Sequence, residues 1–499
     1  MTINPKYMDS IEWEGLQDQY VIKEEVKAQL LQNTVNSRIE LRRDENYLIE
    51  GNITGTIHQG EKELSIEHGQ AGERIEPFII EGSNCSQLEQ FRIEQCYIGN
   101  ITYTYELQNS GNYARKYDAT LNTFYIKRFF QSKDNVEWLT EWYLNGPRGP
   151  FWFPRTTERK YTETFERNRA DYSTQSGKFL GDTSEGFSRD YLLVQLLDYS
   201  CIIHKVPKSF GPTWSENIGI EYRVELGQIP SIETREAIAE IVSFVFGRQL
   251  FNIGHSLFDK HGNPLEQVSI SPWADDAARY SKRHESSPII AQDYTAMSLI
   301  EDCLKSLIPR YLELRDEFAL NDVIQRYWLA GRLPIGTNIP MLHNGIEILA
   351  NSWFRSKRTK TSGVYLPKNE FDRLLAEDFE TVAKKLEALP HGARILNRMK
   401  GSFQTGANEK IELFLQELGL EIGDLERKSI RERNKMIHGS PSRTDVDIDN
   451  SILLANTYKT FFHRVILKIM SYQGLYIDYS VLGWPQKHID EVAGTPCPL

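Results

Sequence analysis

The chain contains 499 residues, of which 40% are hydrophobic and 25% are charged, and it carries a net charge of −11 at pH 7. This length exceeds a single typical core, so we expect two or three domains with the composition of a soluble globular protein. The acidic balance excludes a protein that coats nucleic acid through its overall field, so any RNA binding would depend on local basic patches.

The apolar and cysteine patterns indicate neither a membrane anchor nor a metal site. The longest apolar runs, at residues 240–247 and 464–470, are too short to cross a bilayer, and residues 1–6 lack the pattern of a signal peptide. The five cysteines lie far apart, which predicts reduced thiols and argues against a disulfide framework or a zinc site. We therefore expect a cytoplasmic protein that needs no membrane, metal or cofactor.

Residues 47–229 have the pattern of many short β-strands. The segments 63–67, 91–97 and 101–107 alternate apolar and polar residues, which is the period of a half-buried strand. Glycine, asparagine, aspartate and proline separate these segments, as they do in an antiparallel sandwich or barrel-like sheet. We expect an N-terminal domain of residues 1–285 with a β-rich, antiparallel, sandwich-like fold.

Helical periodicity begins at residues 231–246, where Ser231 can cap a helix, and strands are expected to return within residues 252–270. A polar stretch at residues 273–287 predicts the connection between domains. After it, apolar residues three and four positions apart predict helices at residues 294–319, 321–333, 339–355, 371–389, 409–418, 425–438 and 446–473.

The second domain is therefore expected to be an all-α bundle at residues 290–485, followed by a tail at residues 486–499. A stripe on its last helix predicts the face that packs in the bundle. The stripe consists of Ile448, Ile452, Ala455, Phe462, Val465 and Ile469. The predicted fold class is α+β.

Common enzyme signatures are missing from the sequence. It has no glycine-rich phosphate loop, no paired-cysteine zinc spacing, no His-Glu-x-x-His and no Gly-x-Ser-x-Gly. His255, Asp259 and His261 lie close together, but the turn residues around them predict an exposed loop rather than a metal site. The pair formed by Arg433 and His438 is the remaining constellation with chemical potential.

His438 ends a predicted helix just before a Gly-Ser-Pro sequence, so the negative end of the helix dipole favours its protonated form. Arg433 lies five residues earlier, about 140° around an ideal helix, so the two side chains do not share one face. Fraying of the last turn, or a second copy of the helix in a dimer, would complete the arrangement. The Asn434 amide can orient a phosphate or the imidazole.

A ribonuclease without a metal needs a base for the ribose 2′-hydroxyl, a cation for the charged phosphorane and an acid for the leaving oxygen. His438 can serve as base or acid, and Arg433 can serve as the cation. The alternative is structural: Arg433 caps a neighbouring helix, and His438 only ends its own helix.

Residues 433–438, with the sequence Arg-Asn-Lys-Met-Ile-His, resemble the signature of HEPN-domain ribonucleases. The predicted helix at residues 446–473 is similar to the last helix of that bundle. Glu347 resembles an acidic position on an earlier HEPN helix, although a plain surface or buried glutamate is an alternative. The β-rich first half and the helical segment 241–248 resemble the N-terminal domain of ApeA-type antiphage proteins.

This resemblance implies an abortive-infection effector, an antiphage toxin that cleaves host RNA, with transfer RNA as one candidate, once infection is sensed. It implies a homodimeric or larger assembly with the site across the interface, and an N-terminal domain that binds a phage-derived activator. Arg433, Asn434 and His438 are carried over as catalytic positions, with Glu347 and Lys435 in support. A module that binds nucleotides or proteins without cutting, or a scaffold that only dimerises, remains the alternative.

Two local basic patches are the expected RNA contacts, and solvated surface is their alternative interpretation. The first patch contains Arg355, Lys357 and Arg358, and the second contains Arg427, Lys428, Arg431 and Arg443 beside the predicted catalytic pair.

Overall fold

The structure is a computed structural model. It describes residues 19–23, 34–43, 48–57, 61, 77–84, 88–107, 113–123, 125–130, 134–147, 161–169, 172–180, 191–205, 217–272, 287–292, 297–359, 364–403, 405–437 and 445–494. In residues 19, 122–123, 161–169, 172–180, 205, 297, 407, 433–437 and 445–447 the backbone is described but the side chains are not.

The described residues form two compact units, and their boundary differs from the expected division at residue 285. The first unit lies within Met1–Ser231, Arg248–Ser286 and Gln292–Glu301. The second unit contains Ile232–Gly247, Ser287–Ala291 and the chain from Asp302 onward. The helix at residues 232–246, expected in the N-terminal domain, therefore belongs to the helical unit and not to the β-rich unit.

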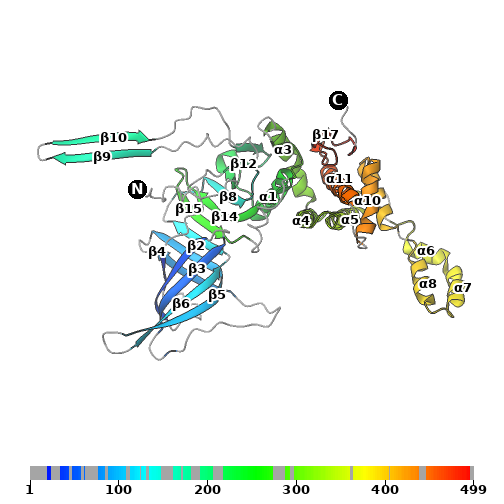
Figure 1. Ribbon diagram of the computed structural model, residues 1–499, viewed down its shortest axis with the longest axis horizontal. Coiled ribbons are helices and arrows are strands. Elements are labelled where there is room, and N and C mark those ends of the chain that lie inside the picture. The colour runs from blue at the N-terminus through cyan, green and yellow to red at the C-terminus, as the bar shows by residue number, and fades with distance from the viewer. Residues whose placement is uncertain are drawn as a thin grey trace. The chain divides into compact units, whose positions relative to one another are not determined.

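The β-rich unit contains one large antiparallel sheet (Figure 1). Its described strands are β1 (Gln19–Ile22), β2 (Thr34–Arg43), β3 (Ile49–Ile57), β4 (Phe78–Asn84), β5 (Glu89–Leu107), β6 (Tyr113–Thr123), β7 (Tyr125–Phe130), β8 (Trp138–Leu144), β11 (Tyr191–Gln195), β12 (Ser200–Lys205), β13 (Ile218–Arg223), β14 (Phe251–Phe258) and β15 (Pro264–Ile270). A separate hairpin joins β9 (Tyr161–Arg169) to β10 (Tyr172–Leu180).

The sheet closes on itself through its long strand β5. In the order β5-β4-β1-β2-β3-β6, the last strand pairs back with the first, with Ile101 opposite Ala119. The beginning of β5 also pairs with β7, where Gln90 faces Phe129, and the sheet continues from there through β15, β14, β8, β13 and β12 to β11. The described strands thus make a closed antiparallel sheet with an open extension, which confirms the expected antiparallel β-rich fold and is closer to the barrel-like alternative than to a sandwich.

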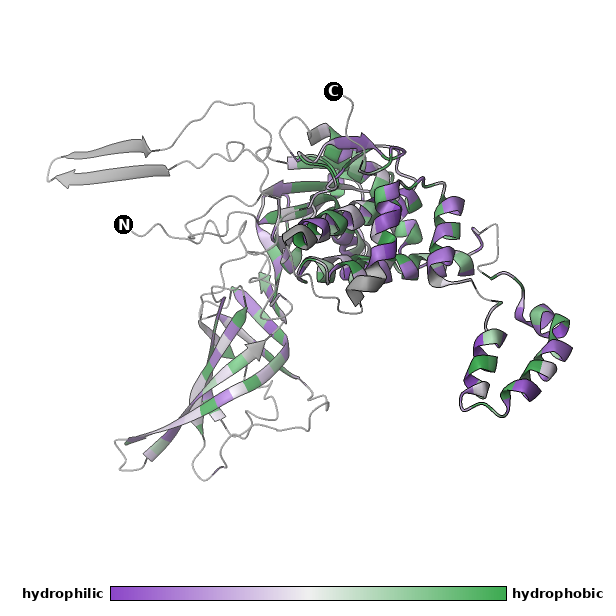
Figure 2. Ribbon diagram, turned by 45° about the vertical axis from the view of Figure 1, so that its right-hand side comes forward, coloured by the Kyte–Doolittle hydropathy of each residue, from purple (hydrophilic) through white to green (hydrophobic). Residues whose placement is uncertain are grey.

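Alternating burial explains how the closed sheet holds its core. Ile39, Leu41, Ile53 and Ile93 are fully buried, while their neighbours along the strands are more exposed. Figure 2 shows the same alternation of hydrophobic and hydrophilic residues along these strands. Alternation with a period of two is therefore the sequence feature that correctly predicted strands here.

The helical unit contains long helices and one small hairpin. The described helices are α1 (Ile232–Phe246), α3 (Met297–Leu314), α4 (Leu320–Gly331), α5 (Ile339–Arg355), α6 (Lys368–Leu374), α7 (Ala376–Leu386), α8 (Gly392–Lys400), α9 (Ala407–Leu418), α10 (Asp424–Ile437) and α11 (Asp445–Ile469). The expected C-terminal tail is partly folded, because β16 (Leu475–Ile477) pairs with β17 (Gln486–His488) and Ile489 is fully buried. No described helix is long and apolar enough to cross a membrane.

Helix α11 packs with α5 and α10 (Figure 1). Four members of its expected apolar stripe, Ala455, Phe462, Val465 and Ile469, are buried. The other two, Ile448 and Ile452, are 50% and 37% exposed at the beginning of the helix. The expected packing face is therefore wrong for the first two turns, because a helical period does not say how far along a helix its partners extend.

Candidate functional site

Helix α10 carries the predicted catalytic segment, and its first half is fixed in the core. The Gly423 N–H donates to Glu426 Oε2 at 2.8 Å, as in a capping box. Glu426 Oε1 accepts a hydrogen bond from Arg464 Nη1 of α11 at 2.6 Å, and both side chains are fully buried. Arg464 Nη2 also donates to the carbonyl oxygen of Glu421. These contacts set the position of α10 against α11.

The predicted catalytic residues fall at the other end of this helix. The backbone of α10 is helical through Arg433, Asn434 and Lys435 to Ile437, the last described residue before His438. The side chains of these three residues, together with all of His438 and Arg443, lie outside what the structure describes. The helix that should carry the pair is therefore present, while the geometry of Arg433 relative to His438 stays a prediction.

Glu347, the expected supporting residue, lies on α5 within a buried polar cluster. Its Oε1 is 3.1 Å from Nε2 of His343, one helical turn earlier, and Nδ1 of that histidine is 2.5 Å from the Tyr458 hydroxyl of α11. His343 and Tyr458 are almost completely buried, whereas the Glu347 side chain is 32% exposed. The carboxylate thus links a buried imidazole to solvent, and such a cluster can fix the imidazole orientation or hold a proton.

Sequence reasoning missed His343 and Tyr458. The spacing of His343 four residues before Glu347 was the available signal, because residues four apart are neighbours on a helix. Tyr458 gave no local signal, since its contact with His343 spans 115 residues of sequence.

Helices α5 and α9 meet at a second polar cluster. Lys410 of α9 donates from Nζ to Asn351 Oδ1 of α5 at 2.7 Å, and the same Nζ lies 5.7 Å from the centre of the Phe354 ring. Arg355 lies one turn after Asn351 on the same helix. Burial, and then the nearby charge of Arg355, lower the pKa of Lys410.

The first predicted basic patch divides into paired and unpaired cations. Arg358 donates from Nη2 to Glu313 at 2.9 Å and from Nε to Glu317 at 3.1 Å, and its bond to Glu313 is the main reason that its pKa is raised. Arg355 and Lys357 are exposed and form no ion pair within the described part of the chain. The local charge of Arg358 is therefore largely neutralised.

The second predicted basic patch lies along α10. Arg427 reaches Asp424 at 3.4 Å across one turn of the helix, and both side chains are well exposed. Lys428 donates to Asn450 Oδ1 of α11 at 3.3 Å. Arg431 is exposed and makes no ion pair with any described residue. These three residues place positive charge on the same helix as the predicted catalytic segment.

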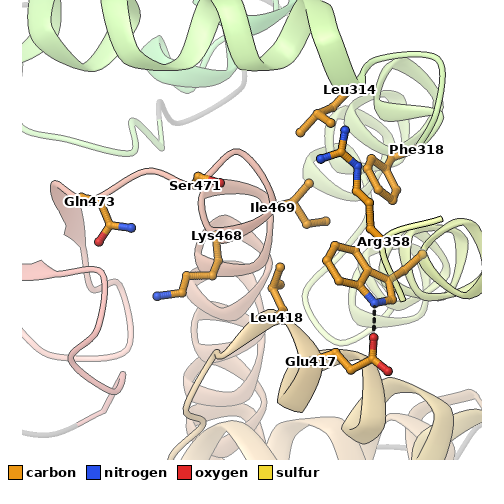
Figure 3. A pocket seen from close by; sticks show the side chains of 10 residues that line it. Leu314, Phe318, Arg358, Glu417, Leu418, Lys468, Ile469, Ser471 and Gln473 are labelled. Carbon is orange, nitrogen blue, oxygen red and sulfur yellow. Dashed lines mark hydrogen bonds between the residues drawn. The ribbon is translucent and has the colours of Figure 1, made fainter. Parts of the chain in front are cut away.

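A cavity of about 310 Å³ opens near the C-terminal end of α11 (Figure 3). Its apolar wall stacks Trp353 on Phe318, with ring centres 5.9 Å apart, and the Trp353 indole N–H donates to Glu417 at 2.8 Å. Arg358 and Lys468 stand at its rim. Lys468 is bonded to Asp490 at 2.7 Å, so both of these rim cations already have carboxylate partners.

Of the three residues considered as metal ligands in the β-rich unit, His255 lies on β14, and Asp259 and His261 belong to the turn that follows this strand. Both oxygens of the Asp259 carboxylate accept hydrogen bonds, from the His261 and Asn263 N–H groups and from the Asn263 amide. His255 Nε2 lies 4.0 Å from Glu266 instead. Across the described residues, no group of three or more His, Cys, Asp or Glu side chains is arranged to hold a metal ion.

Comparison of the chain with family models, curated proteins and solved structures found no match.

Proposed function

We propose that the protein is a metal-independent endoribonuclease of antiphage defence, with its site at the C-terminal end of α10. The observation that carries the proposal is the Arg433–His438 spacing at the end of a helix whose other end is locked into the core by the buried contact between Glu426 and Arg464. A cation and a titratable imidazole held on a rigid element are what phosphodiester cleavage without a metal requires.

In the proposed reaction, His438 removes the proton from a ribose 2′-hydroxyl, and the 2′-oxygen attacks the adjacent phosphorus. Arg433 neutralises the charge that develops on the phosphorane, and Asn434 orients the phosphate. The partner's His438 donates a proton to the leaving 5′-oxygen. The products are a 2′,3′-cyclic phosphate and a 5′-hydroxyl, so no water enters this step.

The beginning of α11 supports a dimeric site. Ile448 and Ile452 lie one turn apart and are exposed, and they follow the catalytic segment closely in the sequence. An exposed apolar strip beside half of a site is suited to pairing with the same strip of a second copy. We expect Ile448→Asp with Ile452→Asp to give a monomer that no longer cuts RNA but still unfolds cooperatively.

The β-rich unit is proposed to sense a phage component and to keep the site quiet before infection. RNA of the host is the proposed substrate, with transfer RNA as one candidate, in the cytoplasm of the infected cell. Deleting residues 1–285 would be a poor test of this role, because the deletion removes α1. Phe244 of that helix packs edge to face on Tyr327 and His463 inside the helical unit.

The test expresses wild-type protein, Arg433→Ala or His438→Ala in bacteria, challenges the cells with phage, and measures how much of the cellular RNA is cut. Arg42→Ala and His261→Ala are matched controls, because both side chains are on the surface of the β-rich unit. We expect both controls to cut RNA like wild type and both site variants to lose at least a hundredfold in rate. Equal cutting by His438→Ala, or RNA that is bound and never cut by wild type, would overturn the proposal.

A further inference from the structure

Among the described residues, the α5–α9 crossing brings two cations near each other without a counter-ion. Lys410 Nζ donates to the neutral amide oxygen of Asn351 at 2.7 Å and lies 5.7 Å from the centre of the Phe354 ring, and the charge of Arg355, one turn after Asn351, is close enough to lower the pKa of Lys410. Neither Lys410 nor Arg355 forms an ion pair within the described part of the chain. Two adjacent cations that lack a carboxylate repel each other, and partial burial of one of them adds to the cost.

Arg358, only three residues beyond Arg355, shows the opposite arrangement. Two carboxylates hold its guanidinium: Glu313 near the end of α3 and Glu317 in the turn that follows that helix. In this region, therefore, Arg358 is a cation that the fold pairs with carboxylates, as expected for a residue with a structural role. Lys410 and Arg355 meet no carboxylate among the described residues, so an anionic ligand can supply the missing negative charge.

The site is also open to a ligand. Arg355 is exposed and Lys410 is half-buried, and Lys357 adds an exposed cation two residues further along. The Asn351 amide fixes the Lys410 ammonium in place, so little side-chain freedom is lost when an anion binds.

We propose that Lys410 and Arg355 form a subsite for a backbone phosphate of the RNA substrate, with Asn351 as the residue that positions Lys410. This inference rests on the proposed function, because it assigns a contact outside the catalytic segment to the same substrate. It also divides the first basic patch: Arg355 contacts RNA, whereas Arg358 is structural. Relief of the repulsion between the two cations by one phosphate supplies part of the binding free energy.

The test measures binding of a fluorescent 20-nucleotide single-stranded RNA to full-length His438→Ala protein, which is expected not to cut the probe. Lys410→Met and Arg355→Met keep the apolar stems and remove the charges, and Arg358→Met is the matched control in the same segment. Each neutralised phosphate contact contributes about 0.7 to the slope of log affinity against log salt for a single strand. We expect Lys410→Met and Arg355→Met each to weaken RNA binding about fivefold and to reduce the slope of log affinity against log salt by about 0.7.

Arg358→Met should leave the affinity within twofold of the parent and the slope unchanged. Lys410→Arg should retain binding, which separates loss of charge from loss of fold. Inorganic phosphate is added as a competitor, and it should displace the RNA only at millimolar concentration if the site reads a polymer backbone. Tight displacement by phosphate would overturn the assignment to RNA.

Different experimental outcomes would contradict the phosphate subsite and the proposed catalytic site. If Lys410→Met and Arg358→Met weaken binding equally, or if neither changes the slope, the subsite is wrong even when His438→Ala abolishes cutting. If the Lys410 effect is present while His438→Ala cuts like wild type, the subsite stands and the proposed catalytic site falls.

Discussion

Two regions of the helical unit differ in whether their cations are paired with carboxylates. Near the end of the chain, Arg464 meets Glu426 at 2.6 Å and Lys487 meets Asp478 at 2.7 Å, and all four side chains are buried. At the α5–α9 crossing, Lys410 has an amide as its acceptor and lies beside Arg355, with no carboxylate partner for either among the described residues.

This difference distinguishes charges that stabilise the fold through ion pairs from charges that we propose to bind a ligand. A matched pair can be buried at little net cost, whereas the half-buried Lys410 and the exposed Arg355 repel each other and give the fold no ion pair in return. Removing a paired charge should therefore cost stability, and removing an unpaired one should cost binding. The following four predictions test this separation, from the largest expected effect to the smallest.

Arg464→Met should have the largest effect on stability. It leaves the Glu426 carboxylate buried without its cation, which is expected to lower the free energy of unfolding by about 3–5 kcal/mol. Urea unfolding of the full chain measures the change. Adding Glu426→Leu should restore part of the loss, because the double variant buries no unpaired charge. A loss below about 1 kcal/mol in Arg464→Met would contradict the structural role of the pair.

His463 should make the same region sensitive to acid. Burial, and then the nearby charge of Lys459, lower the pKa of His463 to about 3, and Nε2 lies 2.9 Å from the Tyr327 hydroxyl. The unfolded chain binds a proton near pH 6.5 and the folded chain does not. Stability is therefore full above about pH 6.5 and is lost as the pH falls toward 3, by an amount on the order of 4 kcal/mol.

The measurement is urea unfolding at a series of pH values between 7 and 4 for wild type and His463→Gln. The glutamine keeps a polar group near Tyr327 but does not titrate, so the curve of the variant should be flatter. Identical curves would show that His463 is not responsible for the acid sensitivity.

Arg358→Met should have a small effect on stability. Its two carboxylate partners lie on the surface, and exposed pairs contribute about 0–1 kcal/mol. Thermal unfolding at low and high salt checks this, since the contribution of the pair should shrink as salt screens it. A decrease of more than about 2 kcal/mol in the free energy of unfolding would show that Arg358 stabilises the fold as strongly as a buried ion pair.

Lys410→Met should have the smallest effect, a change within about 0.5 kcal/mol and without loss of stability. The lowered pKa of Lys410 means that the folded protein disfavours its charge, so removing the charge also removes a repulsion with Arg355. Denaturant unfolding beside Arg358→Met gives the comparison. A clear destabilisation would show that Lys410 has a structural partner and would remove the basis of the phosphate subsite.

Local patterns in the sequence predicted the elements but not their assembly. The apolar period predicted α5 with the bounds that the structure has, Ile339–Arg355. The closure of the sheet between β5 and β6 and the place of α1 in the helical unit depend on contacts between distant segments, which periodicity does not encode. The same limit applies to the site: the pairing of Arg358 with Glu313 spans 45 residues, so no local pattern could show it, and the predicted RNA contact at Arg358 stays a prediction.

The chemistry of the RNA ends left by the protein tests the central claim most directly. RNA from phage-challenged cells, and RNA cut by purified triggered protein in EDTA, would be analysed for its new 3′ and 5′ termini. Attack by the 2′-hydroxyl at the Arg433–His438 site predicts 2′,3′-cyclic phosphate and 5′-hydroxyl ends in EDTA, and their absence in His438→Ala. New 3′-hydroxyl ends, cutting that EDTA abolishes, or the same ends at the same rate from His438→Ala would contradict it.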